Sequence, residues 1–173
     1  QPDRITVTVQ VVNPIACNGG ADGQLSATTS GGIPGYSYVW NDNNVQTTDT
    51  ATGLSAGTYN VTATDQNGCS ATSDDFQLTQ VDELQLTTSS FNVKCFGENN
   101  GSASVQVTGG TPGFTYLWND AMNSTGSSIS GLGPGNYTVT VTDTNNCIRS
   151  ATVTISEPPQ LTVTVTGTNP SCD

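Results

Sequence analysis

The chain has no histidine and few basic residues, and both shortages restrict what it can do. Histidine is the commonest general base and a frequent ligand of transition metals, so its absence argues against much acid–base and metal chemistry. Three basic residues stand against 14 acidic ones, which gives a net charge of −11. Nucleic acids and anionic membranes are bound through lysine and arginine, so we expect neither as a partner.

Long apolar runs are missing as well. No stretch of about 18 apolar residues exists, so the sequence predicts no membrane-spanning helix. The first residues, QPDRITVTVQ, lack the basic and then apolar segments of a signal peptide. We therefore expect these 173 residues to be an internal piece of a longer protein. The abundance of threonine, serine, asparagine and glycine favours strands joined by tight turns.

What the chain does contain is one unit written twice. GGIPGYSYVW (31–40) returns as GGTPGFTYLW (109–118), 109 − 31 = 78 positions later. The same offset relates Trp40/Trp118 within these stretches and six further pairs: Cys17/Cys95, Leu54/Leu132, Gly57/Gly135, Tyr59/Tyr137, Asp65/Asp143 and Cys69/Cys147. A third copy begins as TNPSC (168–172), with Cys172 lying 172 − 95 = 77 positions after Cys95. Such strict periodicity indicates a tandem array of small domains.

This period predicts the domain organisation. The first repeat occupies residues 1–82 and the second residues 83–158, and residues 159–173 hold a linker and the first strand of a truncated third repeat. The joints at 79–84 and 156–161 are short and polar. Pro158 and Pro159 restrict the second joint to extended backbone, so we expect a semi-rigid connection and a stiff stalk.

Alternating apolar residues predict an all-β fold. Tyr59, Val61 and Ala63 share one face of a strand, and threonine and asparagine occupy the other. No segment shows helical periodicity, so we expect tandem immunoglobulin-like antiparallel β-sandwich domains of about seven short strands each. Tyr59 and Tyr137 follow tight turns, as the tyrosine of a tyrosine corner does.

The aromatic residues allow two interpretations. Trp40 and Trp118 lie on a predicted central strand among apolar neighbours, which is typical of a core. The alternative is a platform on which sugar rings stack, and this would require exposed indole rings. A carbohydrate-binding module that uses exposed aromatics or end loops therefore stays open as a second function, with surface polysaccharide as its partner.

Four of the five cysteines come in matched pairs. Cys17 and Cys69 are 69 − 17 = 52 positions apart, and so are Cys95 and Cys147. We predict one disulfide within each repeat, Cys17–Cys69 and Cys95–Cys147, worth about 4 kcal/mol each by loop closure. Cys172, in the truncated copy, is left without an obvious partner. Disulfides imply an oxidising, extracellular setting.

These motifs resemble the SprB repeat family. The matching stretches are CNGGADGQLSATTSGGIPGYSYVW with GLSAGTYNVTATDQNGC, and CFGENNGSASVQVTGGTPGFTYLW with GLGPGNYTVTVTDTNNC. Small departures occur at Gly35 and Gly113, where the family often has a second proline, and at Asn146, which replaces the closing glycine.

The resemblance implies a context. Such repeats are similar to those of giant cell-surface proteins of Bacteroidetes-type bacteria, among them a mobile gliding adhesin exported by the type 9 secretion system. It implies a non-catalytic structural region of a secreted adhesin at the bacterial cell surface, in which neighbouring repeats, or other copies in a filament, are the partners.

Catalysis is not expected. The carboxylate pairs Asp74–Asp75 and Asp82–Glu83 are adjacent in sequence, so on a strand they point to opposite faces and do not converge.

Calcium is the one cofactor that the sequence suggests. Oxygen-bearing side chains cluster near the predicted disulfides, and calcium prefers oxygen ligands. The candidates are Asp22, Asp65, Asn67, Glu98, Asp143 and Asn145. The alternative is that Asp65 and Asp143 form Asx turns with their own backbone, with no ion bound.

Thr50 is a candidate for modification. The triplet Asp49–Thr50–Ala51 resembles the Asp-Thr-aliphatic motif that accepts O-glycans in these bacteria. Asn-x-Ser/Thr triplets also occur, but in a chain rich in asparagine and threonine they are expected by chance.

Overall fold

A computed structural model describes residues 3–167, and this part of the chain contains strands and turns but no helix. The strands of the first repeat are β1 (Thr6–Asn13), β2 (Gly23–Ser30), β3 (Ser37–Trp40), β4 (Thr50–Leu54), β5 (Gly57–Tyr59), β6 (Val61–Thr64), β7 (Ser70–Thr72) and β8 (Phe76–Leu78). Those of the second repeat are β9 (Gln85–Phe91), β10 (Gly101–Thr108), β11 (Thr115–Trp118), β12 (Ser128–Leu132), β13 (Gly135–Thr142) and β14 (Ile148–Ile155).

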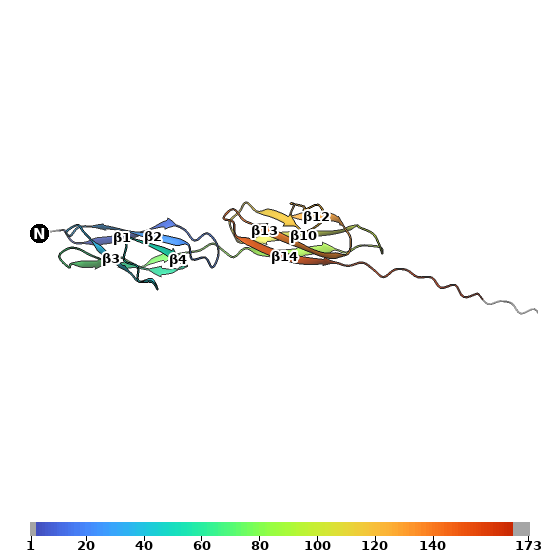
Figure 1. Cartoon of the computed structure of the whole chain (residues 1–173), viewed down its shortest axis with the longest axis horizontal. Coiled ribbons are helices and arrows are strands. Elements are labelled where there is room, and N and C mark those ends of the chain that lie inside the picture. The colour runs from blue at the N-terminus through green and yellow to red at the C-terminus, as the bar shows by residue number, and fades with distance from the viewer. Residues whose placement is uncertain (1–2, 168–173) are drawn as a thin grey trace, which may run out of the picture. The chain divides into compact units, whose positions relative to one another are not determined.

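The first repeat is a sandwich of antiparallel sheets. One sheet has the order β1-β2-β4 and the facing one the order β3-β6-β7, with β5 and β8 paired as a further two-stranded sheet. Figure 1 shows β1 and β2 side by side in one layer and β3 in the other. This arrangement matches strands A-B-E and C-F-G of the immunoglobulin fold. The predicted immunoglobulin-like sandwich is confirmed.

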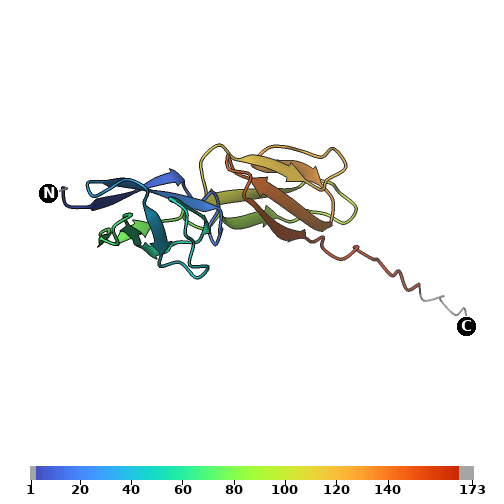
Figure 2. The same cartoon turned by 60° about the vertical axis from the view of Figure 1, so that its left-hand side comes forward.

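The second repeat has the same topology. Its sheets are β12-β10-β9 and β11-β13-β14, and Figure 2 shows β13 and β14 as a long hairpin. Here β13 is continuous where the first repeat has β5 and β6, and β14 is continuous where it has β7 and β8. Each repeat therefore has six strand positions rather than about seven.

Equivalent residues build both cores. In the first repeat the buried cluster is Ile15, Leu25, Trp40, Ala51, Leu54, Val61 and Leu78. The buried residues at the matching positions of the second repeat are Val93, Ala103, Trp118, Ile129, Leu132, Val139 and Ile155. The alternation seen in the sequence correctly identified the inward-facing residues of these strands, and each repeat buries its own apolar set.

Insertions of one residue explain where the 78-residue period changes. A β-bulge between Val11 and Asn13 adds a residue to β1 that β9 lacks. A second extra residue lies in the break between β7 and β8, where the hydroxyl of Ser73 accepts a hydrogen bond from the backbone of Val61 at 3.2 Å. Such bulges absorb an extra residue without turning the rest of the strand over.

The chain divides into two compact units that do not follow the repeat boundaries. The first unit reaches Gln85 and also includes the loops Thr108–Phe114 and Asp143–Cys147. The second unit holds Leu86–Val107, Thr115–Thr142 and the residues from Ile148 onward.

The predicted first strand of a third repeat is absent from residues 159–167. Leu161, Val163 and Val165 are each at least 80% exposed and belong to no strand. In the two complete repeats this strand pairs with the strand that follows it, as β1 does with β2, and no following strand exists among the described residues. Cys172 lies outside the described residues.

Candidate functional site

Two structures recur in both repeats and involve all four matched cysteines. The cysteine loop, residues 15–23 and 93–101, leads from the first strand of each repeat into the second. The cysteine turn, Asp65–Cys69 and Asp143–Cys147, connects β6 to β7 and β13 to β14. Because β1 separates them, the loop and the turn of one repeat lie at opposite ends of its sandwich.

Each cysteine turn is organised by an aspartate. Oδ1 of Asp65 accepts hydrogen bonds from the backbone N–H groups of Asn67 and Cys69, both at 2.9 Å, and Oδ2 accepts one from Ile33 at 3.1 Å. Asp143 does the same with Asn145 and Cys147, both at 2.9 Å, and with Thr111 at 2.8 Å.

These hydrogen bonds control the charge of the two carboxyl groups. The Ile33 N–H is the main cause that lowers the pKa of Asp65 below its ordinary value of 3.8, and it outweighs the opposing effect of desolvation. Burial alone would raise the pKa of Asp143, but the N–H groups of Thr111, Cys147 and Asn145 outweigh it and lower the pKa. Both aspartates are therefore ionised anchors of their turns.

The calcium hypothesis gains no support from this geometry. The oxygens of Asp65 and Asp143 face N–H hydrogens, which is the Asx-turn alternative. Asp22 accepts bonds from the Ala16 N–H at 3.3 Å, and Glu98 accepts one from the side chain of Asn100. Within residues 3–167, no three histidine, cysteine, aspartate or glutamate residues are grouped to hold a metal. Calcium remains an untested prediction.

The disulfide pairing predicted from the sequence is wrong. Cys17 is bonded to Cys147, with 5.7 Å between their Cα atoms, and both belong to the first unit. Cys69 and Cys95 are exposed free thiols.

The physical reason for the correction is the length of a strand. β1 has eight residues, and at roughly 3.3 Å per residue it separates the cysteine loop from the cysteine turn of its own repeat by about 26 Å. A disulfide requires Cα atoms within roughly 7 Å. The equal intervals of 52 residues follow from the repeat itself and say nothing about which partners bond.

Further contacts hold the Cys17 loop against the Cys147 turn. The side chain of Asn145 donates a hydrogen bond to the carbonyl oxygen of Ala16 at 3.0 Å, and the sulfur of Cys147 lies 3.5 Å from the same oxygen. The turn therefore binds the backbone of the loop beside the disulfide.

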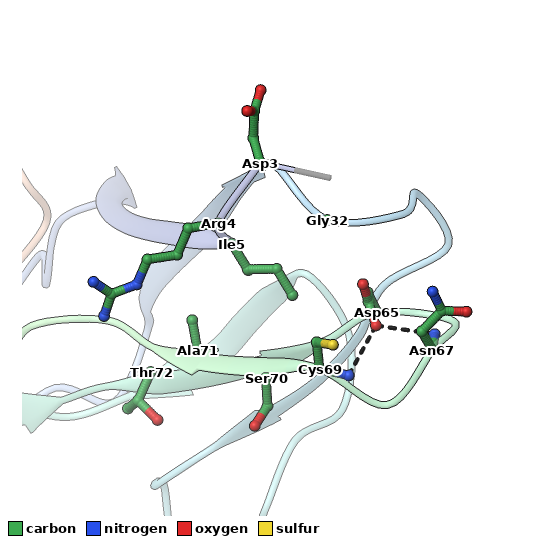
Figure 3. A pocket seen from close by; sticks show the side chains of 10 residues that line it. All are labelled: Asp3, Arg4, Ile5, Gly32, Asp65, Asn67, Cys69, Ser70, Ala71 and Thr72. Atoms are coloured by element: carbon green, nitrogen blue, oxygen red, sulfur yellow. Dashed lines mark hydrogen bonds between the residues drawn. The ribbon is translucent and has the colours of Figure 1, made fainter. Parts of the chain in front are cut away.

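A hollow lies beside the other cysteine turn. It has a volume of about 380 Å³. Figure 3 shows Asp65, Asn67 and Cys69 on the turn, with the Ile5 side chain pointing toward them and the Arg4 side chain pointing away from the turn. Asn67 and Cys69 are the equivalents of Asn145 and Cys147. This hollow contains one free thiol and no converging pair of carboxylates.

The tryptophans form core rather than a sugar platform. Trp40 is 1% exposed and Trp118 is fully buried. Each indole N–H donates a hydrogen bond to a backbone carbonyl, of Thr48 and Gly126 respectively, both at 2.9 Å. The predicted tyrosine corners are also present, since Tyr59 donates to Ser55 O at 2.9 Å and Tyr137 to Gly133 O at 3.1 Å.

Thr50 begins β4, half-buried, and its backbone pairs with Ser26. Its hydroxyl donates a hydrogen bond to Asp49 at 3.2 Å. Glycosylation at Thr50 stays a prediction.

Sequence reasoning missed a second pair of ordering aspartates. Asp42 and Asp120 close the turn after the tryptophan strand, and Asp120 accepts hydrogen bonds from both the backbone and the hydroxyl of Ser124 at 2.8 Å. These bonds lower the pKa of Asp120. The signal was present, because the tripeptide Trp-Asn-Asp recurs at 40–42 and 118–120.

Comparison with known proteins agrees with the internal repeat. The family model described as SprB repeat matches residues 9–45 and 87–123, once in each copy. In both copies the chain is therefore similar to the SprB repeat. This match agrees with the resemblance that the repeated motifs indicated. A search of curated proteins finds no significant match.

Several solved structures share the general fold at low similarity. The C-terminal 282-residue fragment of intimin, crystallised with the intimin-binding domain of its translocated receptor, is 14% identical with a TM-score of 0.42; the match covers 90% of this chain and 64% of that one. The amphioxus IgVJ-C2 molecule is 13% identical with a TM-score of 0.36, covering 90% and 98%. The fibronectin(III)-like modules of Clostridium thermocellum CbhA are 15% identical with a TM-score of 0.33, covering 87% and 94%. At these scores the matches support no functional argument.

A search of the described residues for membrane spans finds no helix with the length and apolar character to cross a bilayer.

Proposed function

We propose that the two SprB repeats are a non-catalytic spacer in a large secreted adhesin at the bacterial cell surface. Repetition supplies length, and other parts of the adhesin contact the ligand. Gliding motility and export by the type 9 secretion system are part of this proposal, as is assembly into an elongated stalk or filament. Two observations support it: each repeat buries an equivalent core, and the chain matches the SprB repeat twice.

The Cys17–Cys147 disulfide is the observation that carries a mechanical role. It joins residues 130 positions apart. Tension applied along the chain enters at Cys17 and leaves at Cys147 through the sulfur–sulfur bond. The residues between them, which include most of both cores, are then shielded from the load.

The surface fits a passive spacer. The chain carries 14 acidic residues and only three basic ones, and this net charge opposes lateral association of copies. The oxidising setting outside the cell keeps the disulfide formed.

Single-molecule stretching tests the proposal. The oxidised chain, pulled from its two ends, is expected to extend about 470 Å less than the reduced chain, because 130 residues at roughly 3.6 Å each stay inside the bridge. Cys17→Ser serves as the control and is expected to extend fully without reductant. Equal extension of the oxidised and reduced chains would contradict the shielding role.

The carbohydrate-binding alternative has its own readout. A module that binds glycan gives saturable binding of soluble polysaccharide in a pull-down or calorimetric titration. We expect no binding, because neither tryptophan is exposed for stacking. Saturable binding would replace the spacer function by carbohydrate recognition.

A further inference from the structure

The two free cysteines occupy meaningful positions in the repeat. The bond that exists joins the cysteine loop of the first repeat to the cysteine turn of the second. If the same pairing is applied 78 positions further along the sequence, Cys95 on the loop of the second repeat would bond to the cysteine turn of another copy. If the pairing is applied 78 positions earlier, Cys69 on the turn of the first repeat would bond to the cysteine loop of another copy. The free Cys69 is thus the equivalent of the bonded Cys147, and the free Cys95 is the equivalent of the bonded Cys17.

The Cys69 turn is built like the turn that is already bonded. Asp65 fixes Asn67 and Cys69 with backbone hydrogen bonds of 2.9 Å, the same length as those from Asp143 to Asn145 and Cys147. In the bonded turn, the side chain of Asn145 holds the loop carbonyl of Ala16. Asn67 lines the open hollow beside Cys69 (Figure 3). The hollow is thus lined by the Asn67 amide and the Cys69 thiol, which correspond to the groups with which Asn145 and Cys147 bind the loop in the bonded turn.

The Cys95 loop is built like the loop that is already bonded. Gly19 N–H donates to the side chain of Gln80 at 2.7 Å, and Gly97 N–H donates to the side chain of Glu157 at 2.9 Å. The carbonyls of Cys17 and Cys95 each accept a bond from the residue three positions later, at 2.9 and 3.2 Å. The second loop is therefore preorganised to present its thiol and the Lys94 carbonyl.

We propose that the Cys69 turn is a docking site for the cysteine loop of another SprB repeat, and that the Cys95 loop is the matching donor. Docking ends in a disulfide between the two thiols. Cys69 and Cys95 lose their protons, a sulfur–sulfur bond forms, and a small disulfide such as oxidised glutathione takes up the two electrons as it is reduced to two thiols.

The consequence for the proposed spacer is a continuous covalent clamp. Each joint would be crossed by the peptide chain and by one disulfide, so that every repeat is bonded to the one before it and the one after it. This inference deepens the spacer function, and it has a separate readout, because it is tested by which cysteines cross-link and not by extension under load.

The test mixes two variants of the whole chain. Cys172→Ser is present in both, and one also carries Cys69→Ser and the other Cys95→Ser, so each has one thiol outside the Cys17–Cys147 bond. After equilibration in reduced and oxidised glutathione, the cross-linked peptides are quantified by mass spectrometry without reduction. We expect the Cys69–Cys95 dimer to exceed the two homodimers together by about tenfold, since docking favours it.

Other outcomes overturn the proposal. Random pairing makes the heterodimer only equal to the sum of the two homodimers, and thiols that carry only glutathione show that no docking occurs. The Cys17–Cys147 peptide, measured in the same digest, shows that each variant has folded.

A matched pair of substitutions tests the contact itself. Asn67→Ala is expected to reduce the heterodimer excess several-fold, because it removes the amide that would bind the Lys94 carbonyl. Asn145→Ala makes the same change in the turn that is already bonded, so the heterodimer excess should stay unchanged. An equal loss in both variants, or in neither, would contradict a docking role for Asn67.

Discussion

At the scale of single residues, the glycines of the repeated GG-x-PG turn are required by two separate constraints. Gly31 has a φ of +76°, and an added Cβ would lie 2.1 Å from the carbonyl oxygen of Arg4. Gly109 has the same constraint against Glu83, at 2.0 Å. Here the segment before the first strand of each repeat passes against the turn backbone, which explains why these residues recur in both copies.

Substitution of Gly31 by alanine should therefore destabilise the first repeat. We expect a loss of about 3 kcal/mol in the free energy of unfolding, from the left-handed backbone and the steric clash together. Gly53→Ala is the control in the same repeat, because its φ is +68° and its nearest neighbour lies at 3.8 Å. It should cost about 1 kcal/mol. Urea unfolding followed by tryptophan fluorescence measures the loss of unfolding free energy in both variants. Equal losses for Gly31→Ala and Gly53→Ala would contradict a steric clash at Gly31.

The aspartates of the cysteine turns predict a dependence on pH. Their folded pKa values lie below 3.8, so their stabilising effect is complete above that pH and is lost as the pH falls through the folded values. The double substitution Asp65→Asn and Asp143→Asn should lower the melting temperature by a constant amount above about pH 4.5, and by less and less below it. Melting curves between pH 7 and pH 2 provide the measurement. A cost that stays constant down to pH 2 would show that ionisation does not matter.

At the scale of secondary-structure elements, most of the sandwich could be predicted from the sequence. Alternation identified Val61, Ala63 and their equivalents as core, because a strand buries one face and exposes the other. The tyrosine corners followed from a tyrosine placed just after a tight turn. Alternation could not reveal the extra residues of β1 and of the β7–β8 break, since a bulge disturbs the pattern only locally.

The β1 bulge leads to a test of the register. Val12 has no partner in β2 and is 49% exposed, while Val7 and Val9 pack against the core. Deletion of Val12 gives β1 the spacing of β9 and leaves Val7 and Val9 facing inward. We expect a change of less than about 1 kcal/mol in the free energy of unfolding. Deletion of Val9 is the control and should cost more, because it replaces an inward valine by a polar residue. Similar costs for both deletions would contradict the assigned register.

At the scale of the whole molecule, the disulfide pairing is where sequence reasoning failed. Equal intervals between cysteines are produced by any tandem repeat, so they fit pairing within a repeat and pairing between repeats equally well. The distinction needs the topology: in an immunoglobulin-like sandwich, the turn after the first strand and the turn before the last strand lie at opposite ends. Cys17 and Cys69 occupy these two turns. Once the sandwich is recognised, the strand length excludes the pairing that seemed natural from spacing.

The Cys17–Cys147 disulfide is the feature of the site on which the proposed mechanical role depends. Cys17 and Cys147 belong to different copies of the repeat in sequence, so in the proposed spacer their disulfide would protect the chain between them from load in a way that a bond inside one sandwich would not. Under the further inference, the exposed thiols of Cys69 and Cys95 would make the same connection to further copies. Mechanical continuity along an array is the property that this arrangement would add to two simple sandwiches if both proposals hold.

Peptide mapping of the oxidised, unreduced chain tests this account most directly. Free thiols are alkylated first, the chain is digested, and the linked peptides are identified by mass spectrometry. The account predicts a peptide pair that links Cys17 to Cys147, with Cys69 and Cys95 either alkylated or linked to each other between two copies. Peptide pairs that link Cys17 to Cys69 and Cys95 to Cys147 would contradict it.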